Sequence, residues 1–234
     1  MSRIAIIPAR GGSKRIPKKN IKQFLGRPII AYSIEAALES QVFDEVMVST
    51  DDEEIELAAK QFGAKVPFRR SNHNSDDYAT TTNVLREVLS NYQSQLNKSF
   101  SEGCCLYPTA PFVSAKRLIE GLSLLRTGDY DSVYPIVKFS YPIWRALKVT
   151  DDQRVSMIWP ENLLKRSQDL QPAYHDAGQW YWFKIERFVQ SGTETMMTNN
   201  SYGLLLNELE VQDIDNEEDW KLAELKFQFR QKRN

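Results

Sequence analysis

Residues 3–20 read RIAIIPARGGSKRIPKKN, a short apolar run followed directly by a loop rich in glycine and lysine. The run at residues 3–8 is apolar on both faces, as strands of a buried parallel sheet tend to be. A second such run, EVMVST, follows at residues 45–50. Between the two, Pro28 can open a helix, because proline is tolerated in the first helical turn. This order of strand, loop, helix and strand is typical of a doubly wound α/β sheet.

The alternation of helix and strand patterns continues to the end of the chain. The acidic run from Asp51 suits a helix N-terminus, and Gly63 would end that helix. Further helices are predicted at residues 80–94 and 114–127, where Ser114 is a suitable N-cap and Gly128 a suitable stop. Further strands are predicted at residues 104–107, 132–137, 179–183 and 203–214, before a closing amphipathic helix. We therefore expect a single domain over residues 1–234, with a mostly parallel central sheet flanked by helices.

Composition and charge narrow the class of protein. Thirty basic and thirty-one acidic residues give a formal net charge of −1, which argues against a general nucleic-acid or anionic-membrane surface. No apolar run is long enough to span a bilayer, so we expect a cytoplasmic protein. Cys104 and Cys105 are adjacent and would point to opposite faces of a strand, which favours a buried, reduced pair. His73 and His175 lie far apart, and no Cys/His spacing resembles a zinc site.

The loop after the first strand carries the strongest functional signal. Gly11 and Gly12 lack side chains, so the backbone there can approach a phosphate closely. The loop matches neither a Walker A motif nor G-x-G-x-x-G, which weakens a dehydrogenase interpretation. A solvated basic loop is the alternative to a phosphate site. Five cationic side chains within ten residues nevertheless favour a polyanion such as a triphosphate: Arg10, Lys14, Arg15, Lys18 and Lys19.

This loop and the strand before it resemble the signature of the sugar-acid cytidylyltransferases, the synthetases of CMP-sialic acid, CMP-Kdo and CMP-pseudaminic acid. The resemblance implies a Rossmann-like nucleotidyltransferase fold, and it implies that Arg10 and Lys19 contact the triphosphate of CTP and act in catalysis. It also implies that the neighbouring loop residues surround the phosphates, namely Ala9, Gly11, Gly12, Ser13, Lys14 and Asn20.

A second matching segment is FRRSNHNSDDYATT at residues 68–81. It resembles the family's region near the cytosine and ribose, and Arg69 and Asp76 match best, with Thr80 beside them. These residues are therefore assigned to CTP binding by resemblance. On the residues alone, a helix start capped by Thr80 is nearly as good an interpretation.

Two further segments bear on the acceptor. LYPTAP at residues 106–111 resembles the LQPTSP turn of the sialic acid enzymes, but Tyr107 replaces the glutamine that contacts the acceptor there. Losing an amide removes a fixed pattern of donor and acceptor, so acceptor choice should differ. The segment RSQDLQPAYHDAG at residues 166–178 looks like the pseudaminic acid branch. The resemblance assigns acceptor recognition to Tyr107, Thr109, Arg166, Gln168, Tyr174, His175 and Asp176.

By spacing alone, a histidine beside an aspartate is more often a structural hydrogen-bonding pair than an acid–base pair. His175 and Asp176 are therefore not assigned to proton transfer. The sugar carboxylate needs a cationic partner, and Arg145 or Arg166 could pair with it in a bidentate manner.

The last matching segment is LEVQDID at residues 209–215. On a strand, Asp213 and Asp215 would project from one face, and Mg²⁺ commonly takes one or two carboxylates with phosphate oxygens and water. A solvated strand end is the alternative. The family places metal-binding aspartates in this context, so the resemblance implies that Asp213 and Asp215 are catalytic ligands of Mg²⁺.

We expect a Mg²⁺-dependent enzyme that joins CMP from CTP to a nonulosonic sugar acid, with pseudaminic acid favoured, and that has no nucleic-acid or membrane partner. Open alternatives are N-acetylneuraminic, legionaminic or Kdo acid as acceptor, a non-catalytic nucleotide-binding module, and a redox enzyme. The irregular residues 139–178 predict a site or an interface. Related enzymes are homodimers through this region, and Tyr141, Trp144 and Trp159 fit an interface, although core packing explains them equally well.

Overall fold

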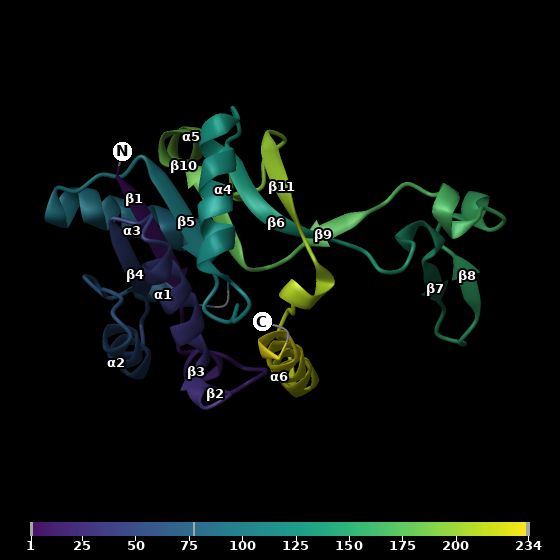
Figure 1. Cartoon of the computed structure of the whole chain (residues 1–234), viewed down its shortest axis with the longest axis horizontal. Helices are drawn as coiled ribbons and strands as arrows, with labels where there is room; N and C mark the ends of the chain where they lie inside the picture. Colours follow the sequence, from purple (N-terminus) through teal and green to yellow (C-terminus); the bar gives the residue numbers. More distant parts are fainter. Residues whose placement is uncertain (1, 77, 233–234) are drawn as a thin grey trace.

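The computed structural model describes residues 2–76 and 78–232. Its centre is a seven-stranded sheet in the order β11-β6-β10-β5-β1-β4, with β9 paired to β6 (Figure 1). Five strands run parallel, and β9 and β10 run antiparallel to their neighbours, so the mostly parallel prediction is confirmed. The strands are β1 Arg3–Pro8, β4 Glu45–Ser49, β5 Glu102–Leu106, β6 Ser132–Lys138, β9 Tyr174–Asp176, β10 Trp180–Lys184 and β11 Ser201–Leu206.

Strand β1 shows why the sheet is buried on both sides. Ala5 and Ile7 face one layer of the core, whereas Ile4 and Ile6 face the other, and all four side chains are fully buried. Cys104 and Cys105 divide between the same two layers and are both free thiols, as the sequence predicts. A strand buried on both faces needs helices on both faces to exclude water.

Helices cover the two faces of the sheet. Helices α1, α2 and α4 pack on the side of Ala5, whereas α3 and α5 pack on the side of Ile4. The helix ends follow the sequence, because the Ser114 hydroxyl accepts from the Arg117 N–H at the start of α4, and Gly63 has a φ of +92° after α2. The helices are α1 Ile29–Ser40, α2 Glu53–Gln61, α3 Thr81–Leu96, α4 Ala115–Thr127, α5 Ile185–Gln190 and α6 Glu217–Gln231.

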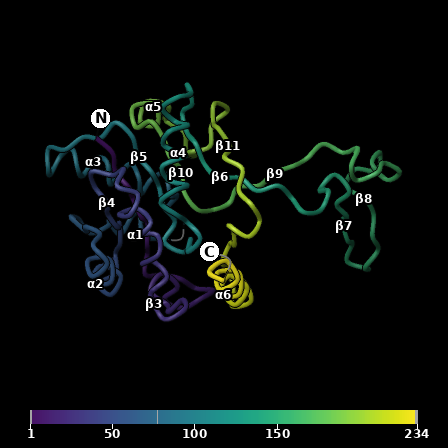
Figure 2. The backbone as a smooth tube through the Cα atoms, viewed as in Figure 1, coloured from purple at the N-terminus to yellow at the C-terminus, as the bar shows by residue number. Residues whose placement is uncertain are grey.

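A third, smaller core joins the two ends of the chain. After β1 the chain forms the short helix η1, Lys19–Ile21, and the hairpin of β2, Gln23–Phe24, and β3, Arg27–Pro28. Phe24 is fully buried and meets Trp220 of α6 edge to face, with ring centroids 5.7 Å apart. The C-terminal helix therefore packs beneath the loop that follows β1 (Figure 2).

Residues 139–173 form an arm that projects from the body between β6 and β9 (Figures 1 and 2). The arm carries a hairpin of β7, Leu147–Val149, and β8, Val155–Met157, and the short helices η3 Ile143–Arg145, η4 Pro160–Asn162 and η5 Ser167–Asp169. The expected irregular segment at residues 139–178 is thus partly ordered, because its last residues pair with β6. Within residues 2–76 and 78–232, none of the helices combines the length and apolarity needed to cross a bilayer.

Candidate active site

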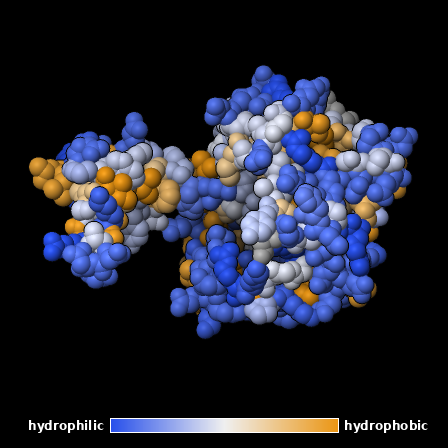
Figure 3. Space-filling model, turned by 180° about the vertical axis from the view of Figure 1, so that it is seen from behind, coloured by the Kyte–Doolittle hydropathy of each residue, from blue (hydrophilic) through white to orange (hydrophobic). Residues whose placement is uncertain are grey.

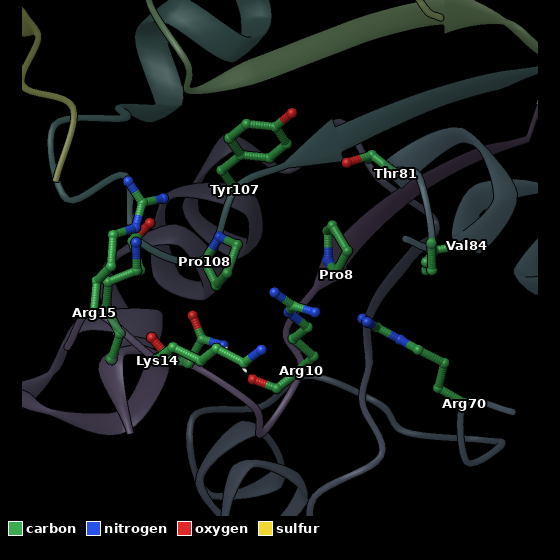
Figure 4. A pocket seen from close by; sticks show the side chains of 14 residues that line it. Pro8, Arg10, Lys14, Arg15, Arg70, Thr81, Val84, Tyr107 and Pro108 are labelled. Carbon is green, nitrogen blue, oxygen red and sulfur yellow. Dashed lines mark hydrogen bonds between the residues drawn. The ribbon is translucent and has the colours of Figure 1, made fainter. Parts of the chain in front are cut away.

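A pocket of about 510 Å³ opens at the carboxyl ends of β1 and β5 (Figure 4). Open α/β sheets bind their ligands at this edge. Pro8 at the end of β1 and Tyr107 directly after β5 form part of the wall, and Thr81 at the start of α3 forms another part. The expected residues Ser13, Asn20 and Thr109 also line this pocket.

The charged side chains described in the lining of the pocket are all basic. Its basic lining residues come from the loop after β1 and from the segment after α2, and none of its described lining residues is acidic. Facing cations repel one another unless an anion lies between them, so the arrangement favours a polyanionic ligand. The basic residues are Arg10, Lys14, Arg15, Lys19 and Arg70.

Backbone and side-chain hydrogen bonds shape the loop after β1. The Ala9 N–H donates to the Ser49 carbonyl over 2.9 Å, and the Asn20 amide donates to the Arg10 carbonyl over 2.9 Å. The Gly11 N–H donates to Asp51 Oδ1 over 3.0 Å. A Cβ at Gly11 would lie 2.7 Å from Asp52 Oδ2, so any other residue there would require the Asp52 side chain to shift.

A Cβ at Gly12 would meet no atom within 4 Å. Ala9, Gly11 and Gly12 thus belong to the loop without lining the pocket.

Lys19 links the N-terminal loop to the C-terminal part of the chain. Its Nζ donates to the Ile214 carbonyl over 2.8 Å. Burial lowers the pKa of Lys19, and the negative charges of Asp215 and Asp213 oppose that shift. Arg15 also pairs with the Asp215 carboxylate at 2.7 Å. The fold therefore brings the two predicted aspartates close to the two cations of the loop.

The strand predicted for residues 203–214 is wrong in its second half. Strand β11 ends at Leu206, the short helix η6 spans Glu208–Glu210, and residues 211–216 form no helix or strand. Val211 and Ile214 are the buried residues of this segment, and their spacing of three does not fit a strand face. Asp213 and Asp215 are consequently carried by a loop that borders the pocket loop.

The surroundings of Asp213 and Asp215 bear on whether these two carboxylates could hold a divalent cation. Among the described residues, no group of three or more His, Cys, Asp or Glu side chains could enclose a metal. Mg²⁺ needs only one or two carboxylates where phosphate oxygens and water complete its shell. Hard carboxylate oxygens beside a polyanion pocket fit such an ion.

The structure separates the two adjacent arginines of the second matching segment. Arg69 is exposed and pairs with Glu53 at 3.2 Å, outside the pocket. Arg70 is 6% exposed, lines the pocket and donates through Nε to Ser49 Oγ over 3.1 Å and through Nη2 to the Ser49 carbonyl. Burial lowers the pKa of Arg70, and Asp51 and Glu87 oppose the shift. Sequence reasoning missed Arg70, although it stood next to the residue chosen.

Asp76 and Thr80 do not line the pocket, but they bond to the backbone and side chains of segments that do. The Asp76 carbonyl accepts from Arg10 Nη1 over 2.8 Å, and its carboxylate accepts from the Tyr78 and Ala79 N–H groups. Thr80 caps helix α3 by accepting from the Asn83 N–H, and its neighbour Thr81 reaches the pocket.

Of the expected acceptor residues, Tyr107 and Thr109 line the pocket. Arg166 and Gln168 lie on the arm, where Arg166 pairs with Asp169 at 2.8 Å. Tyr174 and His175 lie at the base of the arm, with the His175 Nδ1 and the Asp176 carbonyl 2.8 Å apart. Within one chain, these four residues do not line the pocket.

A family model described as cytidylyltransferase matches residues 4–220 of this chain. The chain belongs to the cytidylyltransferase family. This cytidylyltransferase is 40% identical over 227 residues to the pseudaminic acid cytidylyltransferase of Campylobacter jejuni, covering 97% of each chain. It is 34% identical to a bifunctional pseudaminic acid cytidylyltransferase and hydrolase of Helicobacter pylori, covering 100% of this chain and 44% of that one.

Among solved structures, the CMP:2-keto-3-deoxy-manno-octonic acid synthetase complexed with CTP matches with a TM-score of 0.68 and 19% identity. The match covers 99% of this chain and 100% of that chain, and it shows the shared fold. The predicted nucleotidyltransferase fold is confirmed.

Proposed function

We propose that this protein transfers CMP from CTP to pseudaminic acid, giving CMP-pseudaminic acid and pyrophosphate. The observation that carries the proposal is the pocket with five basic and no acidic described lining residues at the carboxyl edge of the sheet. The acceptor follows from the relatives named for pseudaminic acid at 40% and 34% identity.

The residues of the pocket suggest how the reaction proceeds. The triphosphate lies against Arg10 and Lys19, whose positive charges stabilise the pyrophosphate as it leaves. The anomeric hydroxyl of the sugar attacks the α-phosphorus in line, and no covalent enzyme intermediate forms. Arg70 lines the same pocket, where its side chain lies near that of Arg10 (Figure 4), and adds a further fixed charge.

Asp213 and Asp215 would hold a Mg²⁺ ion at the border of the pocket. The ion supplies positive charge to the phosphate oxygens when it is bound. The support for this assignment is that Asp215 pairs with Arg15 and that the charges of both carboxylates act on Lys19, since Arg15 and Lys19 line the pocket.

A pyrophosphate-release assay tests the proposed function. Purified enzyme, CTP and Mg²⁺ are combined with pseudaminic, N-acetylneuraminic, legionaminic or Kdo acid in separate reactions, and each product is identified by mass. We expect the highest kcat/KM with pseudaminic acid. Faster turnover of another sugar acid would make that acid the acceptor in place of pseudaminic acid. If none of the acids led to pyrophosphate release, the protein would instead be a non-catalytic nucleotide-binding module.

Arg70 and Arg69 provide a matched pair of variants. Arg70→Ala should raise the KM for CTP by about ten- to a hundred-fold, the range of a lost charge-assisted hydrogen bond. Arg69→Ala should change it less than about twofold, because exposed ion pairs contribute little. Steady-state kinetics with varied CTP measure both. Arg70→Lys controls for folding, and equal effects of the two alanine variants would contradict the assignment of Arg70 to the nucleotide.

The arm supports a homodimer. Its hairpin exposes Leu147, Val149 and Val155 by 58–59% each, and a groove of about 820 Å³ lies alongside Leu147 and Met157. Apolar surface gathers on the arm in Figure 3. Contiguous exposed apolar surface of this kind marks an interaction site. We assign the arm to packing against a second copy of the chain.

Val149→Asp should convert the protein from a dimer to a monomer, because it places a charge in the apolar interface. Light scattering coupled to gel filtration would report a mass of 27.1 kDa for this variant and twice that for the wild type. Leu57→Asp is the matched control, since Leu57 is 69% exposed on α2, away from the arm. A wild-type protein that remains monomeric would refute the assignment.

A further inference from the structure

The loop at residues 211–216, which we call the aspartate loop, carries both candidate metal ligands but forms no helix or strand. Side chains from other elements hold its backbone. Lys226 Nζ of α6 donates to the Val211 carbonyl over 3.1 Å, and Lys19 Nζ donates to the Ile214 carbonyl over 2.8 Å. The position of the two carboxylates therefore depends on side chains that are distant in sequence from part or all of the loop.

A buried amide holds the residue directly before the aspartate loop. Gln179 is 3% exposed, and its Nε2 donates to the Glu210 carbonyl over 2.6 Å. The Glu210 carboxylate is bound in turn by Arg117 of α4, whose Nε and Nη2 donate to its two oxygens over 3.0 and 2.9 Å. The Asn207 N–H donates to the same carboxylate over 3.1 Å. Glu210 is thus fixed through both its carbonyl and its side chain.

The backbone of Gln179 contacts the wall of the pocket. Gln179 directly precedes β10, which pairs antiparallel with β5, and its carbonyl accepts from the Tyr107 N–H over 2.8 Å. Tyr107 lines the pocket, whereas Gln179 is not among the lining residues. Through its carbonyl and its amide, Gln179 therefore joins the pocket wall to the segment that leads into the aspartate loop.

This connection matters because a metal ligand acts best when its position is fixed before the metal arrives. A loop that is ordered only on binding costs conformational entropy. Asp213 is exposed and follows Glu210 by three residues, so its place depends on the backbone that carries it. Without the Gln179 amide, the Glu210 carbonyl would lose its buried donor, and the segment would shift to find another.

We propose that Gln179 is a positioning residue that fixes the aspartate loop relative to the pocket wall at Tyr107, so that Asp213 and Asp215 can hold the Mg²⁺ of a bound CTP complex. This inference rests on the proposed function and on the assignment of the two carboxylates to the metal. It gives a role in metal binding to a residue that touches neither the metal nor the nucleotide.

Gln179→Met tests the proposal, because methionine keeps the size of the buried side chain and removes the amide donor. Isothermal titration calorimetry measures the Kd of CTP with saturating Mg²⁺ and in EDTA, without the sugar. The wild type should bind CTP more tightly with Mg²⁺, since an ion held by both nucleotide and protein couples them. In Gln179→Met this gain should fall about three- to tenfold, the range of one lost hydrogen bond, while the Kd in EDTA stays within about twofold.

Tyr92→Phe is the matched control for Gln179→Met. Tyr92 is also fully buried, and its hydroxyl donates to the Glu45 carboxylate over 3.3 Å, but it does not line the pocket. This variant should lower the melting temperature, as Gln179→Met does, while the Mg²⁺ gain in CTP binding stays unchanged. The comparison separates positioning from a general loss of stability.

Lys226→Met loosens the aspartate loop from its other side without changing the buried Gln179. It removes the donor to the Val211 carbonyl and should reduce the Mg²⁺ gain in the same direction. Lys221→Met is its control, because it removes the same charge from an exposed position of the same helix and should leave the gain unchanged.

Two results would overturn the positioning role: a wild-type Mg²⁺ gain in Gln179→Met, or an equal weakening of CTP binding with and without Mg²⁺. A wild-type protein whose affinity for CTP does not respond to Mg²⁺ would overturn it together with the assignment of Asp213 and Asp215. The proposed function fails separately, when the wild type forms no CMP-sugar with any nonulosonic acid. An active wild type beside an unaltered Gln179→Met refutes the positioning role alone.

Discussion

Replacing Lys19 with alanine is expected to lower kcat by about 10²- to 10³-fold, the usual loss when one fixed group that stabilises transition-state charge is removed. Lys19 is held in the pocket by its bond to the Ile214 carbonyl, so its charge needs no reorganisation when the phosphate bond breaks. The KM for the sugar should change little, because in the proposed mechanism the ammonium group faces the triphosphate. Single-turnover kinetics with saturating CTP would measure the chemical step directly.

Lys18→Ala is the matched control for Lys19→Ala. Lys18 is adjacent in sequence, but its ammonium group pairs with Glu54 at 2.5 Å and it does not line the pocket. Its kcat should stay within about twofold of the wild type, since exposed ion pairs contribute little. A Lys19→Ala enzyme with the kcat of Lys18→Ala would remove Lys19 from the mechanism.

The lowered pKa of Lys19 also predicts a pH dependence. The ammonium form exists below the pKa, so a pKa below the usual 10.5 means that the charge is lost earlier as the pH rises. The alkaline fall of kcat/KM for CTP, which reports the free enzyme, should therefore begin below 10.5. Lys19→Arg should move this fall to higher pH, because arginine stays protonated.

Asp215→Asn is expected to have the second large effect, a fall of about 10²-fold or more in kcat at a fixed, moderate Mg²⁺ concentration, as expected when charge stabilisation is lost. The amide keeps the size of the side chain and removes the charge that attracts a cation. The Mg²⁺ concentration for half-maximal rate should rise, and chelation with EDTA should abolish the wild-type activity. A titration of rate against Mg²⁺ measures the shift.

Glu217→Gln controls for the removal of one negative charge near the loop. Glu217 lies two residues further on and pairs with Lys22 at 2.5 Å. The Glu217→Gln variant should leave the Mg²⁺ dependence unchanged.

Arg15→Gln tests whether the effect of Asp215→Asn arises from the loss of the ion pair between Asp215 and Arg15. This variant breaks the ion pair but keeps the Asp215 carboxylate. If Arg15→Gln shifted the Mg²⁺ dependence as strongly as Asp215→Asn, Asp215 would be a partner of Arg15 and not a metal ligand.

The parts of the fold that the sequence predicts best are those governed by local patterns. Strand β1 and the helix boundaries at Ser114 and Gly63 depend on neighbouring residues, namely a continuous apolar run, a capping hydroxyl and a left-handed glycine. The basic loop was recognisable for the same reason, since five charges within ten residues need no tertiary information.

Tertiary contacts explain what the sequence left undetermined. Arg69 and Arg70 are equivalent in local sequence, and the bond from the Arg70 N–H to the Thr50 carbonyl, 2.9 Å long, accompanies the burial of the second arginine. The loop at residues 211–216 resembled a strand because Val211 and Ile214 are apolar, but Ile214 packs with Trp220 and Phe24 in the third core. A spacing of three between two apolar residues can therefore be interpreted only when their packing partners are known.

The environment of Tyr181 was also hidden in the sequence. Tyr181 stands in QWYWF, where every residue is buried, so the pattern predicts a strand and no polar contact. Its hydroxyl nevertheless donates to Asp176 Oδ2. The ring of Tyr107, which directly follows β5, packs against that of Tyr181 because β10 pairs antiparallel with β5.

The packing of the C-terminal helix against the loop after β1 has a consequence for biosynthesis. Residues 19 and 214 meet across 195 positions of sequence, and Lys22 meets Glu217 across the same separation. Domains generally fold as units during synthesis. The loop after β1 can therefore reach its final packing only after residues 214–231 have left the ribosome. Competence to bind nucleotide would then arrive late, with the emergence of α6, and a premature stop codon near residue 213 would yield a chain that lacks the third core and has no catalysis.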